Sequence, residues 1–325
     1  MNQIKKNQHW VSQYYLKQFA NSENKLSVYD TMTHKVFTKL KSTKSICSAD
    51  FFYSTQTGIN DEFNQDIENA LSEMEGGFAD EYSDFCSQII NLNISPHLIK
   101  KRLSYHISTL YLRSEYYRNM LNKTESKLMR EIAEKRFSYN RKEFFIKTEE
   151  KIGKPLTDEE KDFIKETIET KKYEINHDNS IHLLMMGKYK TFASLINIKP
   201  WKVLYIPDNL DLKFITSDTP IIEKFPIKEG VYGTPFSQRT QYFTLSKKIL
   251  IEMKPVGTQG KTIKRKEIID RRIVDELNIL RLELSSKYAY SEKKDDFLFA
   301  KEYVELRNKY EQLKLEYGLN RHFYQ

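Results

Sequence analysis

The segment His9–Phe19 constrains the fold more than any other part of the chain. Its eleven residues read His-Trp-Val-Ser-Gln-Tyr-Tyr-Leu-Lys-Gln-Phe, so large side chains crowd together close to the N-terminus. Chain ends fray unless they are tied down, and so much apolar surface needs a buried environment. The spacing therefore predicts a short helix with one side built into the core. That side consists of Val11, Tyr14, Tyr15 and Phe19.

Length and cysteine usage bound the class of protein. The chain has 325 residues, enough for one elaborate domain or two modest ones. Its two cysteines, Cys47 and Cys86, are far apart and lie in no CxxC or Cys/His pattern, so neither a disulfide framework nor a structural zinc site is expected. No apolar run approaches the roughly twenty residues of a membrane span, so we expect a soluble, cytoplasmic protein without a membrane partner.

The balance of charges favours anionic partners. The chain carries 53 Lys and Arg against 45 Asp and Glu, a formal net charge of +8. Such an excess is compatible with nucleic acid as a partner, although much of the charge lies in helices of mixed sign that are typical of solvated surface. Neither an operon partner nor a phage trigger can be identified from the sequence.

Hydrophobic periodicity predicts an α+β protein with one mixed or antiparallel sheet surrounded by helices. We expect a single domain, 1–325, with a hairpin region near its N-terminus and a strand-rich core over 180–291. The expected strands are 26–30 and 35–40 (the hairpin), 50–53, 201–206, 212–216, one or two within 241–254, and 288–290. The expected helices are 60–90, 96–113, 180–197, 265–285 and a C-terminal helix within 297–325.

Residues 121–178 are expected to form a helical insertion. Lys, Glu and Arg dominate this stretch, which is interrupted at Gly153-Lys154-Pro155. It restarts at Thr157-Asp158-Glu159-Glu160, where a threonine followed three residues later by glutamate is typical of a capping box. The pattern predicts a helical hairpin that projects from the body, with solvated charged faces rather than a dedicated binding surface.

The first segment resembles the opening block of an uncharacterised, mainly bacterial family, domain of unknown function 4238. That block has a His-aromatic-Val-Pro-Gln pattern followed by aromatic-Leu and Phe. The resemblance covers most of residues 5–295, and two departures, Ser12 and Lys247 in place of prolines, are expected to loosen local turns. Further matching positions are Ile67-Glu68 with Glu75, Arg113, Phe214-Ile215-Thr216-Ser217-Asp218-Thr219-Pro220, Leu245-Ser246 and Asn278.

The resemblance implies a biological role but no reaction. Some family members lie in mobile-element loci devoted to defence against phages, which implies a prokaryotic anti-phage effector. The candidate binding residues are His9, Gln13, Arg113 and Asn278, with His9 or Arg113 as phosphate contacts. The favoured alternative is that His9 and Gln13 are buried and bonded to the backbone, and Glu68 and Glu75 are expected to pair with cations such as Arg113.

A metal-dependent nuclease is the leading hypothesis for activity. Asp218 and the triplet Glu252-Met253-Lys254 resemble the Asp and Glu-x-Lys of a large nuclease class, in which neighbouring strands hold a divalent ion. In this hypothesis Asp218 and Glu252 hold Mg²⁺ and Lys254 stabilises charge. Two alternatives remain open: Glu252 and Lys254 could form a solvated strand end, and Asp218 could accept backbone amides in a turn. The protein would then be a non-catalytic sensor or binding module with a basic surface.

Overall fold

A five-stranded sheet lies at the centre of the computed structural model, which describes residues 7–53, 56–57, 62–63, 66–91, 96–171, 173–175, 177, 179–224, 236–257 and 263–317. In spatial order the strands are β10 (Ile221–Lys224), β11 (Thr240–Ser246), β12 (Ile249–Met253), β8 (Trp201–Tyr205) and β13 (Ile263–Glu267). Neighbours are antiparallel except β13, which is parallel to β8. The predicted α+β class with a mixed sheet is confirmed.

A second five-stranded sheet replaces part of the single sheet that the sequence predicts. Its strands are β3 (Lys35–Val36), β2 (Lys25–Asp30), β14 (Tyr288–Ser291) and β9 (Thr216–Ser217), with β4 (Lys41–Ser42) also paired to β2. The predicted hairpin is present as β2 and β3, although β3 is short. Because β14 lies between β2 and β9, this sheet joins an early segment of the chain to a late one. Two small ladders pair β1 (Asn7–His9) with β5 (Ser48–Asp50) and β6 (Gln56–Thr57) with β7 (Glu62–Phe63).

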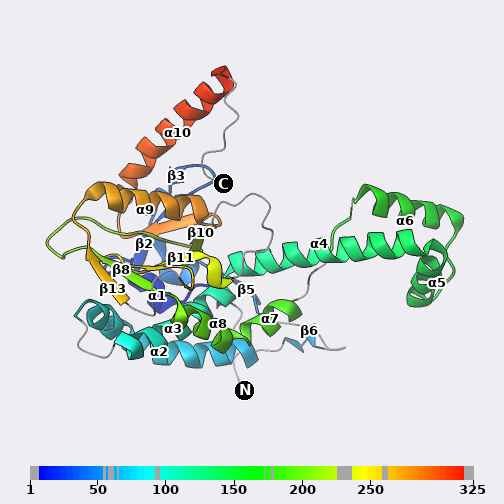
Figure 1. The fold of residues 1–325 in the computed structure, drawn as a ribbon, viewed down its shortest axis with the longest axis horizontal. Helices are drawn as coiled ribbons and strands as arrows, with labels where there is room; N and C mark the ends of the chain where they lie inside the picture. Colours follow the sequence, from blue (N-terminus) through cyan, green and yellow to red (C-terminus); the bar gives the residue numbers. More distant parts are fainter. Residues whose placement is uncertain are drawn as a thin grey trace.

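Helices cover both faces of the central sheet, as Figure 1 shows. One face is covered by α1 (Gln13–Lys17), α2 (Asp66–Asn91), α3 (Pro96–Arg113), α7 (Ser180–Met186) and α8 (Tyr189–Ile198). The other face is covered by α9 (Arg271–Leu284), and α10 (Leu298–Tyr317) leaves the body beyond it. No helix in the described part of the chain is both long and apolar enough to cross a membrane.

Strand alternation explains the two covered faces. Val203 and Ile251 point into the large core below the sheet, where they meet α1, α2, α3 and α8. Leu204 and Leu250, one residue along each strand, point the other way and pack against Val274 of α9. Successive side chains of a strand face opposite sides, so these strands are apolar on both sides, as sheets covered twice require.

Three helices form an arm that projects from the body (Figure 1). They are α4 (Glu115–Tyr139), α5 (Arg141–Ile152) and α6 (Asp158–Thr170). The predicted capping box is present, because the Thr157 side chain accepts from Glu160 N–H while the Glu160 side chain accepts from Thr157 N–H. Ser114 caps α4 in the same way, accepting from the N–H of Tyr117 at 3.2 Å. The arm therefore begins six residues before the predicted boundary at 121.

Several expected elements differ from the structure. The helix expected over 180–197 is split into α7 and α8 at Gly187 and Lys188. The strand expected over 212–216 is reduced to β9, and the strand expected over 50–53 ends at Asp50 as part of β5. The helix expected from Arg265 begins only at Arg271, because residues 263–267 pair with β8 and Asp270 then caps the helix through Arg272 N–H.

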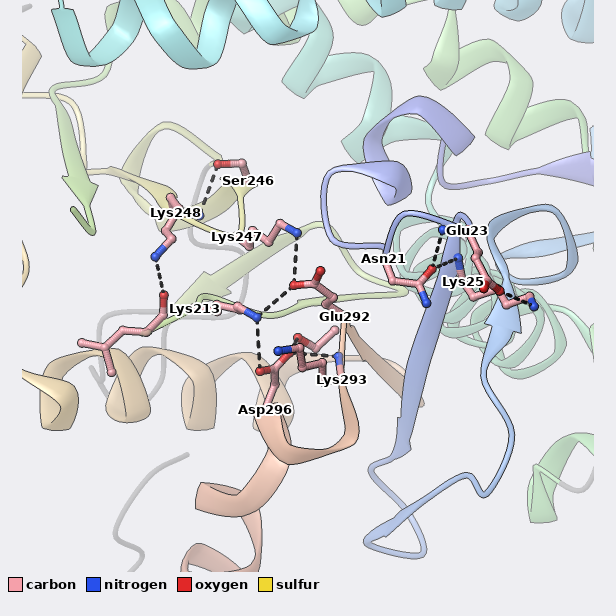
Figure 2. A network of polar contacts seen from close by, with 12 residues as sticks. Asn21, Glu23, Lys25, Lys213, Ser246, Lys247, Lys248, Glu292, Lys293 and Asp296 are labelled. Atoms are coloured by element: carbon pink, nitrogen blue, oxygen red, sulfur yellow. Dashed lines mark hydrogen bonds and ion pairs between the residues drawn. The ribbon is translucent and has the colours of Figure 1, made fainter. Parts of the chain in front are cut away.

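An ion-pair network joins the two sheets, and Figure 2 shows it from close by. Lys247, in the turn between β11 and β12, lies 3.2 Å from Glu292, which directly follows β14. Lys213 Nζ lies 2.9 Å from Glu292 and 3.8 Å from Asp296. Burial raises the pKa of Glu292, but the hydrogen bonds from both lysines outweigh it and the pKa is lowered. Lys247, expected to loosen its turn in place of a proline, instead ties that turn to the second sheet.

Tyr15 of α1 also ties the two sheets together. The residue has no exposed surface, and its hydroxyl lies 2.7 Å from Thr216 Oγ1 and donates to Thr244 O at 2.9 Å. Thr216 belongs to β9 of the second sheet, whereas Thr244 belongs to β11 of the central sheet. Its ring stacks on Phe243 at a centroid distance of 5.6 Å. The N-terminal segment is thus part of the core, as the sequence predicts.

We expect Tyr15→Ala to lower the free energy of unfolding by about 3–5 kcal/mol, because it removes a buried ring and two hydrogen bonds. Tyr15→Phe should cost about 1–3 kcal/mol, since the ring stays and Thr244 O loses its donor. Urea unfolding measures both. Tyr139→Ala, at a residue that is 92% exposed, is the control. Equal effects at Tyr15 and Tyr139 would contradict a core role for this segment.

His106 of α3 is a buried neutral base. Its Nδ1 lies 2.7 Å from the Tyr14 hydroxyl, and the rings of Phe78, Tyr82 and Phe243 surround it. Burial, together with the nearby Arg113 charge, lowers the pKa of His106 from 6.5 to about 3. The folded protein therefore resists protonation of a group that the unfolded chain protonates readily.

Stability should consequently fall in acid. Because the folded pKa of His106 is depressed, its contribution is present above pH 6.5 and is lost as the pH falls toward 3. We expect a loss on the order of 3 kcal/mol by pH 4, measured by urea unfolding at several pH values. His106→Gln should flatten this dependence in part, because burial also lowers the pKa of His182 to about 4. An unchanged slope in the variant would show that His106 is protonated in the folded state.

Candidate functional site

Asp218 lies in the turn after β9 and is 2% exposed. Its carboxylate accepts three successive backbone N–H groups of residues 286–288, at 3.0, 2.7 and 2.8 Å. The Thr219 hydroxyl lies 3.4 Å from Oδ1. Burial raises the pKa of Asp218 to about 6 against the lowering effect of these N–H groups. Asp218 thus accepts backbone N–H groups, as in the turn alternative, but the donors lie before and at the start of β14 rather than in the Ser-Asp-Thr-Pro turn. The carboxylate therefore joins residue 218 to the start of β14.

These contacts do not fit a magnesium ligand. Each Asp218 oxygen already faces two donors, so a metal ion would have to displace hydrogen-bond donors that the carboxylate already holds. Glu252 lies in β12 of the central sheet, whereas Asp218 follows β9 of the second, and no interaction among the described residues joins their side chains. Nor do the described residues contain a group of three or more His, Cys, Asp and Glu placed to hold a metal ion.

Asn278 and Arg281 hold the chain on both sides of this turn. Asn278 accepts from Ile215 N–H at 3.0 Å and donates to Lys213 O at 2.9 Å, so it pairs with the chain before β9 as a strand would. Arg281 is 1% exposed and donates to the carbonyls of Thr219 and Pro220, both at 2.8 Å. Burial lowers the pKa of Arg281 to about 10.

Asn278 is therefore positioned as a structural residue, although the sequence suggests it as a binding residue. Arg281 is absent from the sequence predictions. The signal that points to it is its spacing, because it follows Asn278 by three residues and Val274 by seven and so lies on the buried face of α9.

Arg113 gathers four parts of the chain around one buried guanidinium. Only 2% of Arg113 is exposed. Its Nε donates to the Tyr53 hydroxyl at 3.1 Å, and its Nη1 donates to Ser12 Oγ at 3.1 Å and to the Glu75 carboxylate. Its Nη2 donates to the backbone carbonyl of His9. The expected pairing of Glu75 with Arg113 is confirmed, and it compensates the positive charge.

His9 and Gln13 lie beside this cluster. The His9 imidazole is half-buried, with Nε2 3.2 Å from Lys44 O, and burial lowers its pKa. Gln13 is half-buried and makes no hydrogen bond with the described residues. Ser12, in the place of the family proline, donates to Glu75 at 2.8 Å and so adds to the anchoring. His9 and Arg113 thus converge in a cluster that fixes the N-terminal segment to α2 and α3. The side chains of Ile67 and Glu68 lie outside the described ones.

Glu252 occupies a cross-strand row on the face of the central sheet toward α9. The register places Tyr242, Glu252, Lys202 and Lys264 side by side on β11, β12, β8 and β13. Glu252 lies 3.9 Å from Lys202 Nζ, and its side chain is 16% exposed. Burial raises the pKa of Tyr242 to about 12, and the charge and hydrogen bonding of Glu252 add to this.

The row ends in a surface that we call the basic edge: Lys202, Lys254, Lys264, Arg265 and Lys266. Lys264, Arg265 and Lys266 are all exposed on β13, the last strand of the sheet. Lys254 follows β12, and its N–H donates to Pro200 O, which places it next to β8. The acids on these strands are Glu252 and Glu267, the latter accepting from Tyr205 at 3.1 Å. Five cations and two carboxylates thus lie at this edge.

Strand alternation gives these cations two directions. Lys264 and Lys266 share the face of Lys202, because the register pairs Lys264 with Lys202 and side chains alternate along β13. Arg265 points to the opposite face, where its guanidinium donates to the carbonyl of Ile90 at the end of α2. Arg265 therefore has a structural role as well as a charge, whereas Lys264 and Lys266 are candidates for contact with a partner.

Together these features define an α+β protein of two joined sheets, with a helical arm and an N-terminal segment locked by a buried arginine. A family model described as a protein of unknown function (DUF4238) matches residues 7–295, so the chain belongs to that family. No curated protein and no solved structure matches it.

The two roles of Asp218 can be separated by Asp218→Asn. An asparagine amide cannot accept from all three N–H groups of residues 286–288, so we expect a loss on the order of 1–3 kcal/mol of unfolding free energy, equal with and without Mg²⁺. Asp80→Asn, at an exposed position of α2, is the control. A variant as stable as the parent, whose melting temperature no longer rises with Mg²⁺, would instead favour a metal ligand.

Proposed function

We propose that the protein binds nucleic acid through the basic edge and acts as a binding or sensor module. The observation that carries this proposal is the excess of cations at this edge of the sheet, five against two carboxylates, with Lys202, Lys264 and Lys266 on one face. Phosphate backbones bind such clusters because each contact releases a condensed counterion, and this attraction requires no particular base sequence. The net charge of +8 acts in the same direction at longer range.

The position of β13 supports an intermolecular role for these lysines. An exposed edge strand offers unpaired backbone groups to other strands, and lysines on it oppose such pairing. Lys264 and Lys266 are both exposed on this strand, which has a neighbour on one side within the described sheet. The lysines therefore allow a polyanion to bind at this edge while they oppose pairing with a further strand.

A binding role accounts for the acidic residues better than a catalytic one. Asp218 is occupied by backbone N–H groups, and Arg113 is neutralised by Glu75. Metal-dependent phosphodiester hydrolysis stays a prediction, and the one observation in its favour is that Glu252 lies among Lys202 and Lys254, where a bound backbone would pass. The anti-phage role and the cytoplasmic location also stay predictions.

We expect Lys264→Gln/Lys266→Gln to weaken binding of the full-length protein to fluorescent DNA and RNA oligonucleotides. If both lysines contact phosphates of a duplex, the slope of log K against log salt should fall in magnitude by about 2. Fluorescence anisotropy over a salt series measures this for single- and double-stranded probes. The matched control is Lys35→Gln/Lys39→Gln, which removes two exposed lysines near the second sheet.

Equal weakening in both double variants would contradict a defined binding edge, and so would wild-type protein that binds none of the probes. Thermal melts of each variant establish that the fold is kept. The same probes incubated with Mg²⁺ test the nuclease prediction: cleavage that Glu252→Gln abolishes while binding persists would favour hydrolysis at this edge.

A further inference from the structure

The arm carries a groove between α4 and the chain that returns from α6 toward the body. Three contacts show that the returning chain runs antiparallel to α4. They join Lys171 to Glu134 at 2.9 Å, Tyr173 O to Arg130 Nη2 at 2.9 Å, and His177 Nε2 to Ser126 Oγ at 2.8 Å. Figure 1 shows α4 as the longest element of the arm, extending away from both sheets. The groove is therefore separate from the basic edge.

The groove holds an open pocket of about 640 Å³ that is lined by polar and charged residues. Its charged lining residues are Lys123, Lys127, Arg130, Lys171, Glu131 and Glu134, and the remaining ones are two asparagines, a serine and a histidine. Lys123, Lys127 and Arg130 follow one another at helical spacing of four and three residues. Side chains at such spacing share one face of a helix, so these three cations line the groove along about 10 Å of α4.

Among the described lining residues, four Lys and Arg side chains stand against two glutamates. Glu134 is paired with Lys171, and Glu131 is the other acid of the lining. Arg130 is held in place by Tyr173, through the carbonyl and through the ring at 5.6 Å from the guanidinium carbon. Its Nε is buried and has no hydrogen-bond partner among the described residues. A buried guanidinium donor without a partner is costly, and an anion is the ligand that would satisfy it.

We propose that this groove binds a small phosphorylated ligand of nucleotide size, with Lys123 and Arg130 contacting its phosphate groups. The volume lies in the range of pockets that hold small molecules. The row of cations is long enough to meet more than one phosphate group, and the asparagine amides at its end, Asn119 and Asn122, offer donors and acceptors for a base or sugar. Concavity favours a small molecule over a polymer, which needs an extended track.

The test uses the full-length protein and isothermal titration calorimetry with ATP, inorganic tripolyphosphate and adenosine as probes. We expect ATP and tripolyphosphate to bind and adenosine to show no binding, because the cations recognise phosphate. Lys123→Gln/Arg130→Gln should weaken ATP binding about tenfold or more, since two charge-assisted contacts are removed. The matched control is Arg136→Gln/Lys142→Gln, which removes the same charge from exposed positions outside the groove.

Three results would overturn the proposal. They are no binding of ATP or tripolyphosphate at concentrations up to about 1 mM, adenosine binding as tightly as ATP, and equal affinities in the groove and control variants. Circular dichroism of each variant checks that the arm remains helical. Lys264→Gln/Lys266→Gln should leave ATP affinity unchanged, so the groove and the basic edge can fail independently.

Discussion

The buried guanidinium of Arg113 is the interaction on which the N-terminal half of the structure depends. It meets the backbone of β1, the cap of α1, a tyrosine after β5 and a carboxylate of α2 at once, from the last residue of α3. Taking such a group out of water is expensive, and a buried ion pair adds little net stability over a well-packed apolar cluster. The guanidinium instead fixes how the segments lie relative to one another, because its five N–H donors have a fixed geometry that only one arrangement of partners satisfies. The residues around Arg113 therefore hold together an assembly of chain segments.

A second set of buried polar groups joins the two sheets. Asp218, Asn278 and Arg281 each bond to backbone groups of a neighbouring segment. Tyr15 bridges β9 and β11 from the N-terminal side. Chain that passes between two sheets cannot satisfy its backbone groups by strand pairing, so side chains supply the missing partners. Four different segments of the chain meet at the Ser-Asp-Thr-Pro turn, and this is why the turn requires these particular residues.

Local signals explain which parts of the fold could be predicted. α3 starts and ends where proline and the helical spacing place it, and the capping box at Thr157 identifies the start of α6. β13 could not be predicted from the sequence, because its Lys-Arg-Lys run lacks the alternation of a half-buried strand. Its partner β8 also lies far away in the sequence. The same limit applies to function. The sequence predicts that Glu75 pairs with a cation such as Arg113, but the partners of Asp218 and the burial of Arg281 come from β14 and α9, whose positions only tertiary packing decides.

The geometry of α4 has a mechanical consequence. Its first turn is fixed in the body, since Ser114 follows Arg113 directly and Tyr117 is 3% exposed against Tyr111. Its 25 residues span about 37 Å. A rod clamped at one end converts a small rotation into a large excursion at the other, so a tilt of about 5° at Ser114 moves the far tip by about 3 Å. A change in the tilt of α4 beside the arginine cluster would therefore displace the far end of the arm, and a displacement of the far end would tilt the first turn.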